Sequence, residues 1–405
     1  MSRSSRALRG AWVALLVALG LGGGALAEFP PYARDTANVR EQSEVPLLIE
    51  SKGTLKAGNY ALKVQVGDST HLANVFEDKG KTYLATVIDH VPSQGQVTLK
   101  VLQAPLLESP KSGVDLIPQG RRFEVRVDGK PVTEYIPDDG PKPYFFPLVG
   151  PSGATMTRSY PMKKVEGEKL DHPHQRSLWF THGSVNKVDF WSETPGHGRI
   201  VETSRPTVVG GPSMGMLRTT DDWLAADGKK VCEDERVVRI WATRKARILD
   251  FDITLKATNG PVTFGDTKEG MFGMRVSTSM DVTSKKGGKI VNADGIEDKT
   301  AWGKPAIWVD YTGPVDGKTV GVAILNHPSS FRYPTTWHVR DYGLFAANPF
   351  GWHDFGQKTS GEYVLPAGES ISFRYRVILH DGDTPSAGLT GAFQAYADPP
   401  KVFIE

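Results

Sequence analysis

Cysteine is almost absent from the 405-residue sequence, because Cys232 is its only example. A single cysteine excludes an intrachain disulfide framework and any iron–sulfur or metal site built from several cysteines. An excess of charge is also missing, since 48 lysines and arginines face 46 acidic residues. This balance gives no indication of a nucleic-acid or membrane-surface partner.

Several common signals are missing as well. No apolar stretch after the first 27 residues approaches the roughly 18 that a transmembrane helix needs. The sequence has no glycine-rich phosphate loop, no serine-nucleophile elbow and no zinc-protease helix. Glycine (43 residues) and proline (28 residues) are abundant by contrast, which favours many turns and few long helices. These observations leave a turn-rich enzyme or binding protein.

The first 27 residues have the pattern of an export signal. Three arginines precede an uncharged apolar run at 11–21, and residues 25–27 (Ala-Leu-Ala) form a small-x-small cleavage motif. The apolar run is too short to span a bilayer comfortably, and no twin-arginine pair is present. We therefore expect a Sec-type signal peptide and a periplasmic or extracellular protein with no membrane contact after cleavage.

Alternation of apolar and polar residues predicts strands through most of the remaining sequence. Tyr60–Val66 and Phe123–Val127 alternate with period two, and Asp128-Gly129 is a typical two-residue hairpin turn. Only residues 387–397 have a helical pattern, which ends before Pro399. We therefore expect an all-β fold. Its parts are a linker and small β-rich module at 28–108, a large antiparallel β-sandwich at 109–383, and a short helix and tail at 384–405.

Histidines are concentrated between positions 171 and 183. In an extended segment His172 and His174 point to the same face, and Pro173 stiffens the backbone between them. Imidazoles placed in this way can exchange protons near neutral pH, donate hydrogen bonds to hydroxyl groups or bind a metal. We interpret both histidines as catalytic and expect no metal. If a divalent metal does bind, His172, His174 and His182 are the expected ligands.

Two carboxylates lie in the glycine-flanked segment Phe264–Gly270. Asp266 or Glu269 could act as a general base if burial or a partner brings its pKa near the working pH. Gly270 permits a close approach to the backbone beside Glu269, which favours that residue slightly. The alternative is a solvated turn in which Lys268 pairs with Glu269.

A third polar and aromatic group lies between residues 337 and 353. Here His338 could act as an acid, and Arg340 could hold an anionic or hydroxyl-rich ligand unless it pairs with Asp341. Flat aromatic faces combined with many hydrogen-bond donors suit a sugar. The substrate-binding candidates in the three groups are Arg176, Trp179, His182, Trp191, Arg340, Asn348, Trp352 and His353.

Five motifs, in order, resemble one bacterial family over roughly residues 115–383. The motifs are Tyr144–Gly150, Asp171–Trp179, His182-Gly183 with Asp189–Trp191, Phe264–Gly270, and Trp337–Phe350. The sequence is similar to an uncharacterised, DUF6807-like family that is often labelled methane oxygenase PmoA. The resemblance implies a galactose-mutarotase-like β-supersandwich, a scaffold of aldose epimerases and polysaccharide-active enzymes that often use a histidine acid and a carboxylate base. The methane monooxygenase subunit of that name spans the membrane several times, unlike this sequence, and the family supplies no catalytic residues.

These patterns lead to one main hypothesis and two alternatives. The main hypothesis is an exported carbohydrate-active enzyme, of epimerase, hydrolase or lyase type, that acts on a sugar or oligosaccharide without a cofactor. Glu269 or Asp266 would take a proton, and His338 or a histidine of the 172–182 group would give one. The alternatives are a non-catalytic sugar-binding protein of the cell envelope and a histidine-ligated metalloenzyme or oxygenase. The catalytic hypothesis requires His172, Glu269 and His338 to meet at one surface.

Overall fold

The computed structural model describes residues 44–405 apart from positions 52, 54, 57–59, 90–95 and 103–111. The predicted signal peptide and most of the predicted linker therefore lie outside the described residues. The described residues all belong to one compact unit of the chain. No helix in the described part of the chain is long and apolar enough to cross a membrane.

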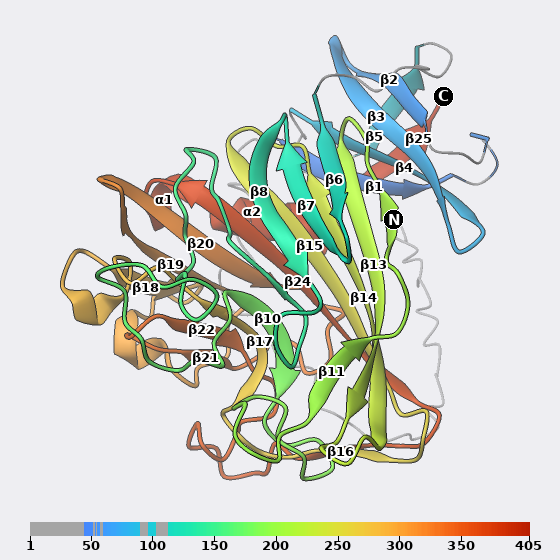
Figure 1. Ribbon diagram of the computed structural model, residues 1–405. Coiled ribbons are helices and arrows are strands. Elements are labelled where there is room, and N and C mark those ends of the chain that lie inside the picture. The colour runs from blue at the N-terminus through green and yellow to red at the C-terminus, as the bar shows by residue number, and fades with distance from the viewer. Residues whose placement is uncertain (1–43, 52, 54, 57–59, 90–95, 103–111) are drawn as a thin grey trace, which may run out of the picture. The chain divides into compact units, whose positions relative to one another are not determined.

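A six-stranded sheet contains the first strands of this unit (Figure 1). Its spatial order is β1 (Val45–Glu50), β4 (Lys81–Ile88), β3 (Ser69–Asp78), β2 (Tyr60–Val66), β5 (Gln96–Val101) and β25 (Lys401–Ile404). The last of these strands pairs parallel to β5. It was not expected from the sequence, where the same residues read as a tail. The sheet has its own apolar cluster, which includes Val64, Val75, Leu84 and Leu99.

The second sheet has eight strands, and its pairings are antiparallel. Their spatial order is β21 (Trp337–Val339), β22 (Leu344–Ala347), β17 (Gly270–Arg275), β10 (Leu178–His182), β9 (Tyr144–Phe145), β8 (Lys130–Ile136), β7 (Arg122–Val127) and β6 (Val114–Gln119). The predicted hairpin is confirmed as β7 and β8. Asp128 and Gly129 have φ of 51° and 73°, as a primed two-residue turn requires.

The third sheet has nine strands, and its pairings are also antiparallel. Its main path is β11 (Arg199–Glu202), β13 (Met214–Leu224), β14 (Lys230–Trp241), β15 (Ala246–Lys256), β24 (Ser370–Asp381), β20 (Lys318–Asn326), β19 (Trp308–Val315) and β18 (Lys289–Asn292), and β12 (Thr207–Val209) pairs with β13. Short elements complete the fold: β16 (Val262–Phe264), β23 (Tyr363–Leu365), α1 (Thr384–Ala387), α2 (Leu389–Ala397) and the 3-10 turns Val282–Ser284 and Asp298–Ala301.

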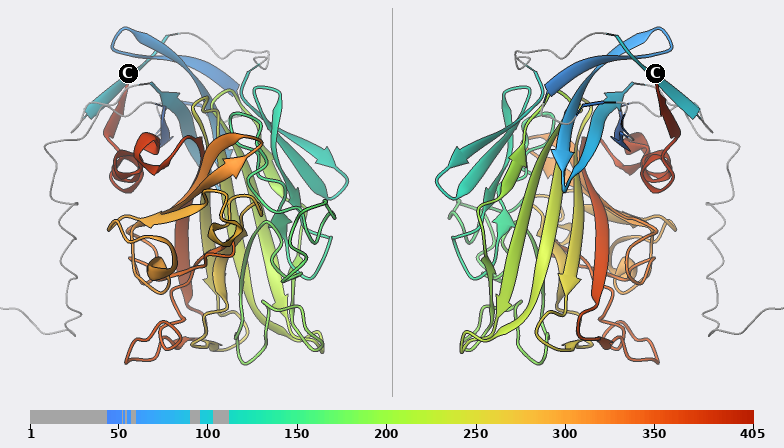
Figure 2. Two further views of the ribbon diagram at one scale, coloured as in Figure 1. Left: turned by 90° about the vertical axis from the view of Figure 1, so that its left-hand side faces the viewer. Right: turned by 90° about the vertical axis from the view of Figure 1, so that its right-hand side faces the viewer.

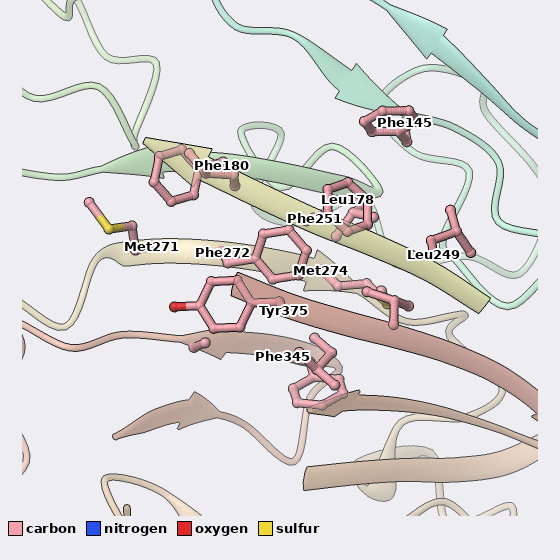
Figure 3. Close-up of a cluster of buried hydrophobic side chains, with 14 of the residues drawn as sticks. Phe145, Leu178, Phe180, Leu249, Phe251, Met271, Phe272, Met274, Phe345 and Tyr375 are labelled. Carbon is pink, nitrogen blue, oxygen red and sulfur yellow. The ribbon is translucent and has the colours of Figure 1, made fainter. Parts of the chain in front are cut away.

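The two large sheets pack face to face and form the main core (Figure 3). Phe272 of β17 stacks on Tyr375 of β24 with 4.7 Å between ring centroids. Phe145 of β9 meets Phe251 of β15 edge-on at 5.6 Å. Because each pair joins one sheet to the other, the structure confirms a large antiparallel β-sandwich. Figure 2 shows this arrangement from two sides, and α2 is the short C-terminal helix that the sequence predicted.

Strand alternation sends a second set of side chains to the other face of the eight-stranded sheet. In β10, Leu178 and Phe180 enter the main core, whereas Trp179 belongs to a separate apolar cluster. In β21, Trp337 and Val339 enter the core and His338 lies between them in sequence, so its side chain points to the opposite face. We call this side the outer face. Its apolar cluster contains Ile136, Tyr144, Trp179, Trp191, Leu344 and Ala346.

Candidate functional site on the outer face

Two tryptophans form the buried base of the outer face. Trp179 and Trp191 contact each other at 5.2 Å, and they are 2% and 1% exposed. Trp179 lies directly against Gly273 of the neighbouring strand, where a side chain would collide with both indole rings. Neither indole N–H has an acceptor among the described residues. Because buried donors usually have partners, these two unpaired N–H groups are unusual. The sequence predicted Trp179 and Trp191 as substrate-binding residues, and both lie buried beneath the outer face.

Asp171 and His172 form a supported acid–imidazole pair. Arg158 and Arg275 both donate hydrogen bonds to Oδ1 of Asp171. Although partial burial acts in the opposite direction, the charges of Arg275 and Arg158 lower the pKa of Asp171. Its Oδ2 lies 3.4 Å from Nδ1 of His172, whose side chain is 40% exposed. Asp171 therefore remains anionic and orients an imidazole that solvent and ligands can reach.

Tyr342 connects the histidine segment to the segment after β21. Its ring stacks on His172 with 5.2 Å between centroids. The guanidinium groups of Arg275 and Arg340 lie over the same ring at 5.0 and 5.4 Å. Burial raises the pKa of Tyr342, and the charge of Glu269 acts in the same direction. Tyr342 thus contacts His172, Arg275 and Arg340.

His338 lies beside the same arginine and is kept neutral. Its ring is enclosed by Trp302 and Phe355, with centroid distances of 6.2 and 6.1 Å. Burial, followed by the charges of Arg340 and Lys268, lowers the pKa of His338 to about 3. The indole N–H of Trp302 donates to Nδ1 of His338 at 3.4 Å. Since Nδ1 accepts, the neutral ring carries its proton on Nε2 and can donate a hydrogen bond there.

Glu269 is positioned by the turn that enters β17. Asn348 donates its amide N–H groups to the carbonyl oxygens of Thr267 and Lys268 at 2.9 and 2.8 Å. Gly183 donates its backbone N–H to the Glu269 carbonyl at 2.6 Å. A Cβ at position 183 would lie 2.8 Å from Cβ of Glu269, so this close approach requires glycine. The Glu269 carboxylate lies 3.4 Å from Lys268 Nζ and is 36% exposed.

Three segments that are far apart in the sequence therefore meet on the outer face, as the catalytic hypothesis required. His172 contacts Tyr342, the charge of Glu269 acts on Tyr342, and Arg340 links Tyr342 to the environment of His338. The common surface offers one exposed imidazole, one half-exposed carboxylate, one neutral hydrogen-bond donor and one cation. Aromatic rings lie between these groups, which suits proton exchange on a hydroxyl-rich ligand.

The side chains of Asp266 and Asn348 hydrogen-bond to backbone groups of the neighbouring loops, including the N–H of His353. The Asp266 carboxylate accepts hydrogen bonds from the N–H groups of His353 and Gly361. Asn348 uses its carbonyl oxygen on the N–H groups of Phe350 and Gly351, in addition to its amide contacts. The side chain of His353 is exposed, and no contact to the outer face was found for it among the described residues. These bonds fix the loops, so catalysis by Asp266 and substrate binding by Asn348 have no geometric support.

His182 is separated from the other two histidines. Its side chain is 0% exposed and lies against Phe350 and Phe264, with centroid distances of 5.1 and 6.2 Å. Nε2 lies 2.8 Å from the carbonyl oxygen of Gly265, and burial lowers its pKa to about 4. His182 is therefore a packed residue, although the sequence offered it as a substrate-binding residue and, if a metal binds, as a ligand. Across the described residues, no group of three histidine, cysteine, aspartate or glutamate side chains is placed to hold a metal.

Arg176 is occupied by a carboxylate rather than free for substrate. It donates to both oxygens of Glu193 at 2.9 and 3.0 Å, and to the Asp139 carbonyl at 3.2 Å. The fully buried Lys142 donates to the same carboxylate at 2.7 Å. Burial lowers the pKa of Lys142 to about 8. Burial, together with the charge of Lys142, also lowers the pKa of His174 to about 4.

Trp352 is the last of the predicted substrate-binding residues, and three further residues of the site were not predicted. The guanidinium of Arg332 lies 4.3 Å above the Trp352 ring, so this tryptophan packs on a cation outside the cluster just described. Tyr342, Trp302 and Phe355 were not singled out in the sequence. Tyr342 could have been noticed because it follows the Arg340-Asp341 dipeptide, but Trp302 and Phe355 lie in glycine-containing turns without a functional pattern.

Comparison with known proteins identifies the family. A model for a family of unknown function, DUF6807, matches residues 122–394, so the chain belongs to that family. No curated protein matches the sequence.

Several solved glycosidase structures show distant similarity. The galactosidase domain of an α-galactosidase–sucrose kinase is 11% identical, with a TM-score of 0.34, and the alignment covers 66% of this chain and 41% of that one. The α-galactosidase AgaA from Geobacillus stearothermophilus is 10% identical, with a TM-score of 0.29, and the alignment covers 83% of this chain and 41% of AgaA. A glycosyl hydrolase family 38 protein from Enterococcus faecalis is 10% identical, with a TM-score of 0.29, and the alignment covers 87% of this chain and 45% of that protein. The chain spans less than half of each structure, and these scores are too low to indicate a function.

Proposed function

We propose that this protein is an exported carbohydrate-active enzyme that acts on a sugar or modified sugar by general acid–base catalysis. The observation that carries the proposal is the contact of Tyr342 with His172 of the Asp171–His172 pair and with Arg340, with Glu269 directly before β17, the strand that pairs with β22. A proton donor, a proton acceptor and a cation on one aromatic surface suit epimerisation, glycoside hydrolysis or β-elimination. The substrate would be a small saccharide or an oligosaccharide.

His172 and Glu269 are the proton-exchanging groups in this proposal. Both side chains are more than one third exposed, so both can reach a bound sugar. Glu269 takes a proton from the substrate, and protonated His172 gives one to an oxygen of the substrate. Asp171 stabilises the imidazolium and fixes the orientation of the ring.

His338 has a supporting role in place of the acid role considered from the sequence. With a pKa near 3 it is neutral at neutral pH, so it has no dissociable imidazolium proton to give. A neutral imidazole can still donate a hydrogen bond to a developing oxyanion through Nε2–H. Tyr342, Trp302 and Phe355 supply the flat faces against which the C–H side of a sugar packs.

Turnover of saccharides by two variants tests the proposal. The purified protein is incubated with a panel of neutral and acidic oligosaccharides, and NMR of the products distinguishes epimers, hydrolysed ends and unsaturated sugars. Glu269→Gln and His172→Asn should each lower kcat/KM by roughly 10²- to 10⁴-fold. The matched control is Glu124→Gln on β7, because Glu124 is likewise partly exposed and paired with a cation, Arg126. The control should keep wild-type activity.

The same panel separates the alternatives. Full activity in both variants would remove the acid–base mechanism. Sugar binding that survives both substitutions, with no turnover by the wild type at any pH, would favour the non-catalytic binding protein. The metalloenzyme suggested by the methane oxygenase label predicts stoichiometric copper, iron or zinc that is lost in His174→Ala.

A further inference from the structure

Arg340 has no carboxylate partner, although its neighbours do. Among the described residues, no ion pair or side-chain hydrogen bond involves its guanidinium, even though Asp341 follows directly. The other arginines of the outer face are occupied by acids: Arg158 and Arg275 by Asp171, and Arg176 by Glu193. Arg340 therefore presents N–H donors that the protein itself does not use.

Aromatic rings hold Arg340 in place without neutralising it. Its guanidinium lies 5.5 Å from the Trp302 ring centroid and 5.4 Å from that of Tyr342. Such contacts restrict the side chain while leaving the positive charge intact. A restrained guanidinium loses less conformational entropy on binding than a free surface lysine does.

Arg340 and Lys268 place two positive charges near His338. Both Arg340 and Lys268 act with burial to lower the pKa of His338, which shows that their positive charge reaches the ring. Glu269 pairs with Lys268 at 3.4 Å and leaves Arg340 uncompensated. Asp171 and Glu193 are each shared by two cations. A negatively charged ligand would therefore be attracted to this surface.

We infer that the substrate is an acidic sugar whose carboxylate binds to Arg340. The inference rests on the proposed function and narrows its substrate class. A guanidinium presents two parallel N–H donors that match the two oxygens of a carboxylate. With the carboxylate on Arg340, the sugar ring lies beside Tyr342, whose ring also contacts His172. Arg340, held by its aromatic contacts, and the exposed Asp171–His172 pair then act on the same bound sugar.

Matched pairs of acidic and neutral sugars test this inference. The probes are glucuronate with glucose, galacturonate with galactose and mannuronate with mannose, as free sugars and as short oligosaccharides. Binding to the wild-type protein is measured by titration calorimetry and ligand-detected NMR at low and high salt. In at least one pair the acid should bind roughly 10-fold tighter or more at low salt, and the preference should shrink as salt is added.

Arg340 variants then assign the preference to this side chain. Arg340→Gln should bring the ratio of acidic to neutral affinity close to one. Arg340→Lys should keep part of the preference, because it keeps the charge but not the paired donors. Arg126→Gln on β7 is the control, and thermal melting checks the folding of each variant.

The outcomes separate the inference from the proposed function. Equal binding of both members in every pair, or an acidic preference that survives Arg340→Gln in a folded protein, would overturn the inference and leave a neutral-sugar enzyme standing. If no sugar binds, acidic or neutral, the proposed function fails together with the inference. A preference that disappears only in the Arg340 variants supports both.

Discussion

The buried, neutral state of His338 predicts a specific loss of stability in acid. Its pKa is about 3 in the folded protein, whereas an imidazole in the unfolded chain titrates near pH 6.5. Between these values the unfolded state binds a proton that the folded state does not. The associated stability is therefore fully present above pH 6.5 and is lost progressively as the pH falls toward 3. From pH 7.5 to pH 5 the loss from this one residue is about 2 kcal/mol.

Replacement of His338 by glutamine isolates that contribution. Glutamine keeps a neutral N–H donor near the position of Nε2 but does not titrate, so His338→Gln should lose about 2 kcal/mol less than the wild type over the same pH interval. Urea unfolding followed by tryptophan fluorescence at both pH values gives the two differences. The control His353→Gln, at an exposed histidine, should follow the wild type. An equal loss in His338→Gln and wild type would refute the neutral donor assigned here.

Four further predictions follow from other parts of the structure. Phe272→Ala should lower the free energy of unfolding by roughly 3–5 kcal/mol, measured in urea, because it opens a cavity between the two large sheets. Asp171→Asn should lower kcat/KM by roughly 10-fold or more, since the neutral amide neither holds the His172 ring in place nor stabilises a positive charge on it; an unchanged kcat/KM would contradict the pairing. Chelation of divalent metals should leave sugar turnover intact, and activity lost on chelation and restored by one metal would revive the metalloenzyme. N-terminal sequencing of the exported protein should begin at residue 28, and a start at residue 1 would exclude the cleaved signal.

Local sequence predicted the strands well because the strand signal is itself local. Period-two alternation in Phe123–Val127 reports directly which side chains face the core, and Asp128-Gly129 reports the turn. The motifs around His172, Glu269 and Arg340 were also found, because they combine polar and aromatic residues in short segments. That these segments meet depends on the strand order β10, β17, β22 and β21 in the sheet, which alternation within one strand does not encode.

The roles of individual polar residues were harder to predict, because burial and hydrogen-bond partners decide what each side chain can do. Asp266 and Glu269 look alike in the sequence, but the first is used by backbone N–H groups and the second remains half exposed. His182 and His172 likewise differ only in burial, which decides whether an imidazole can take a proton. Burial of one side chain is set by distant segments, so these differences became visible only in the folded structure.

The six-stranded sheet is completed only by β25, the C-terminal strand that pairs parallel to β5. Every other pairing in that sheet joins strands within residues 45–101, but β25 adds Lys401–Ile404 beside Gln96–Leu99. Until Lys401–Ile404 joins the sheet during folding, β5 has an uncovered edge that could recruit a strand from another molecule. A chain ending at residue 400 would keep that edge permanently, so it should self-associate during folding even though its large sandwich is complete.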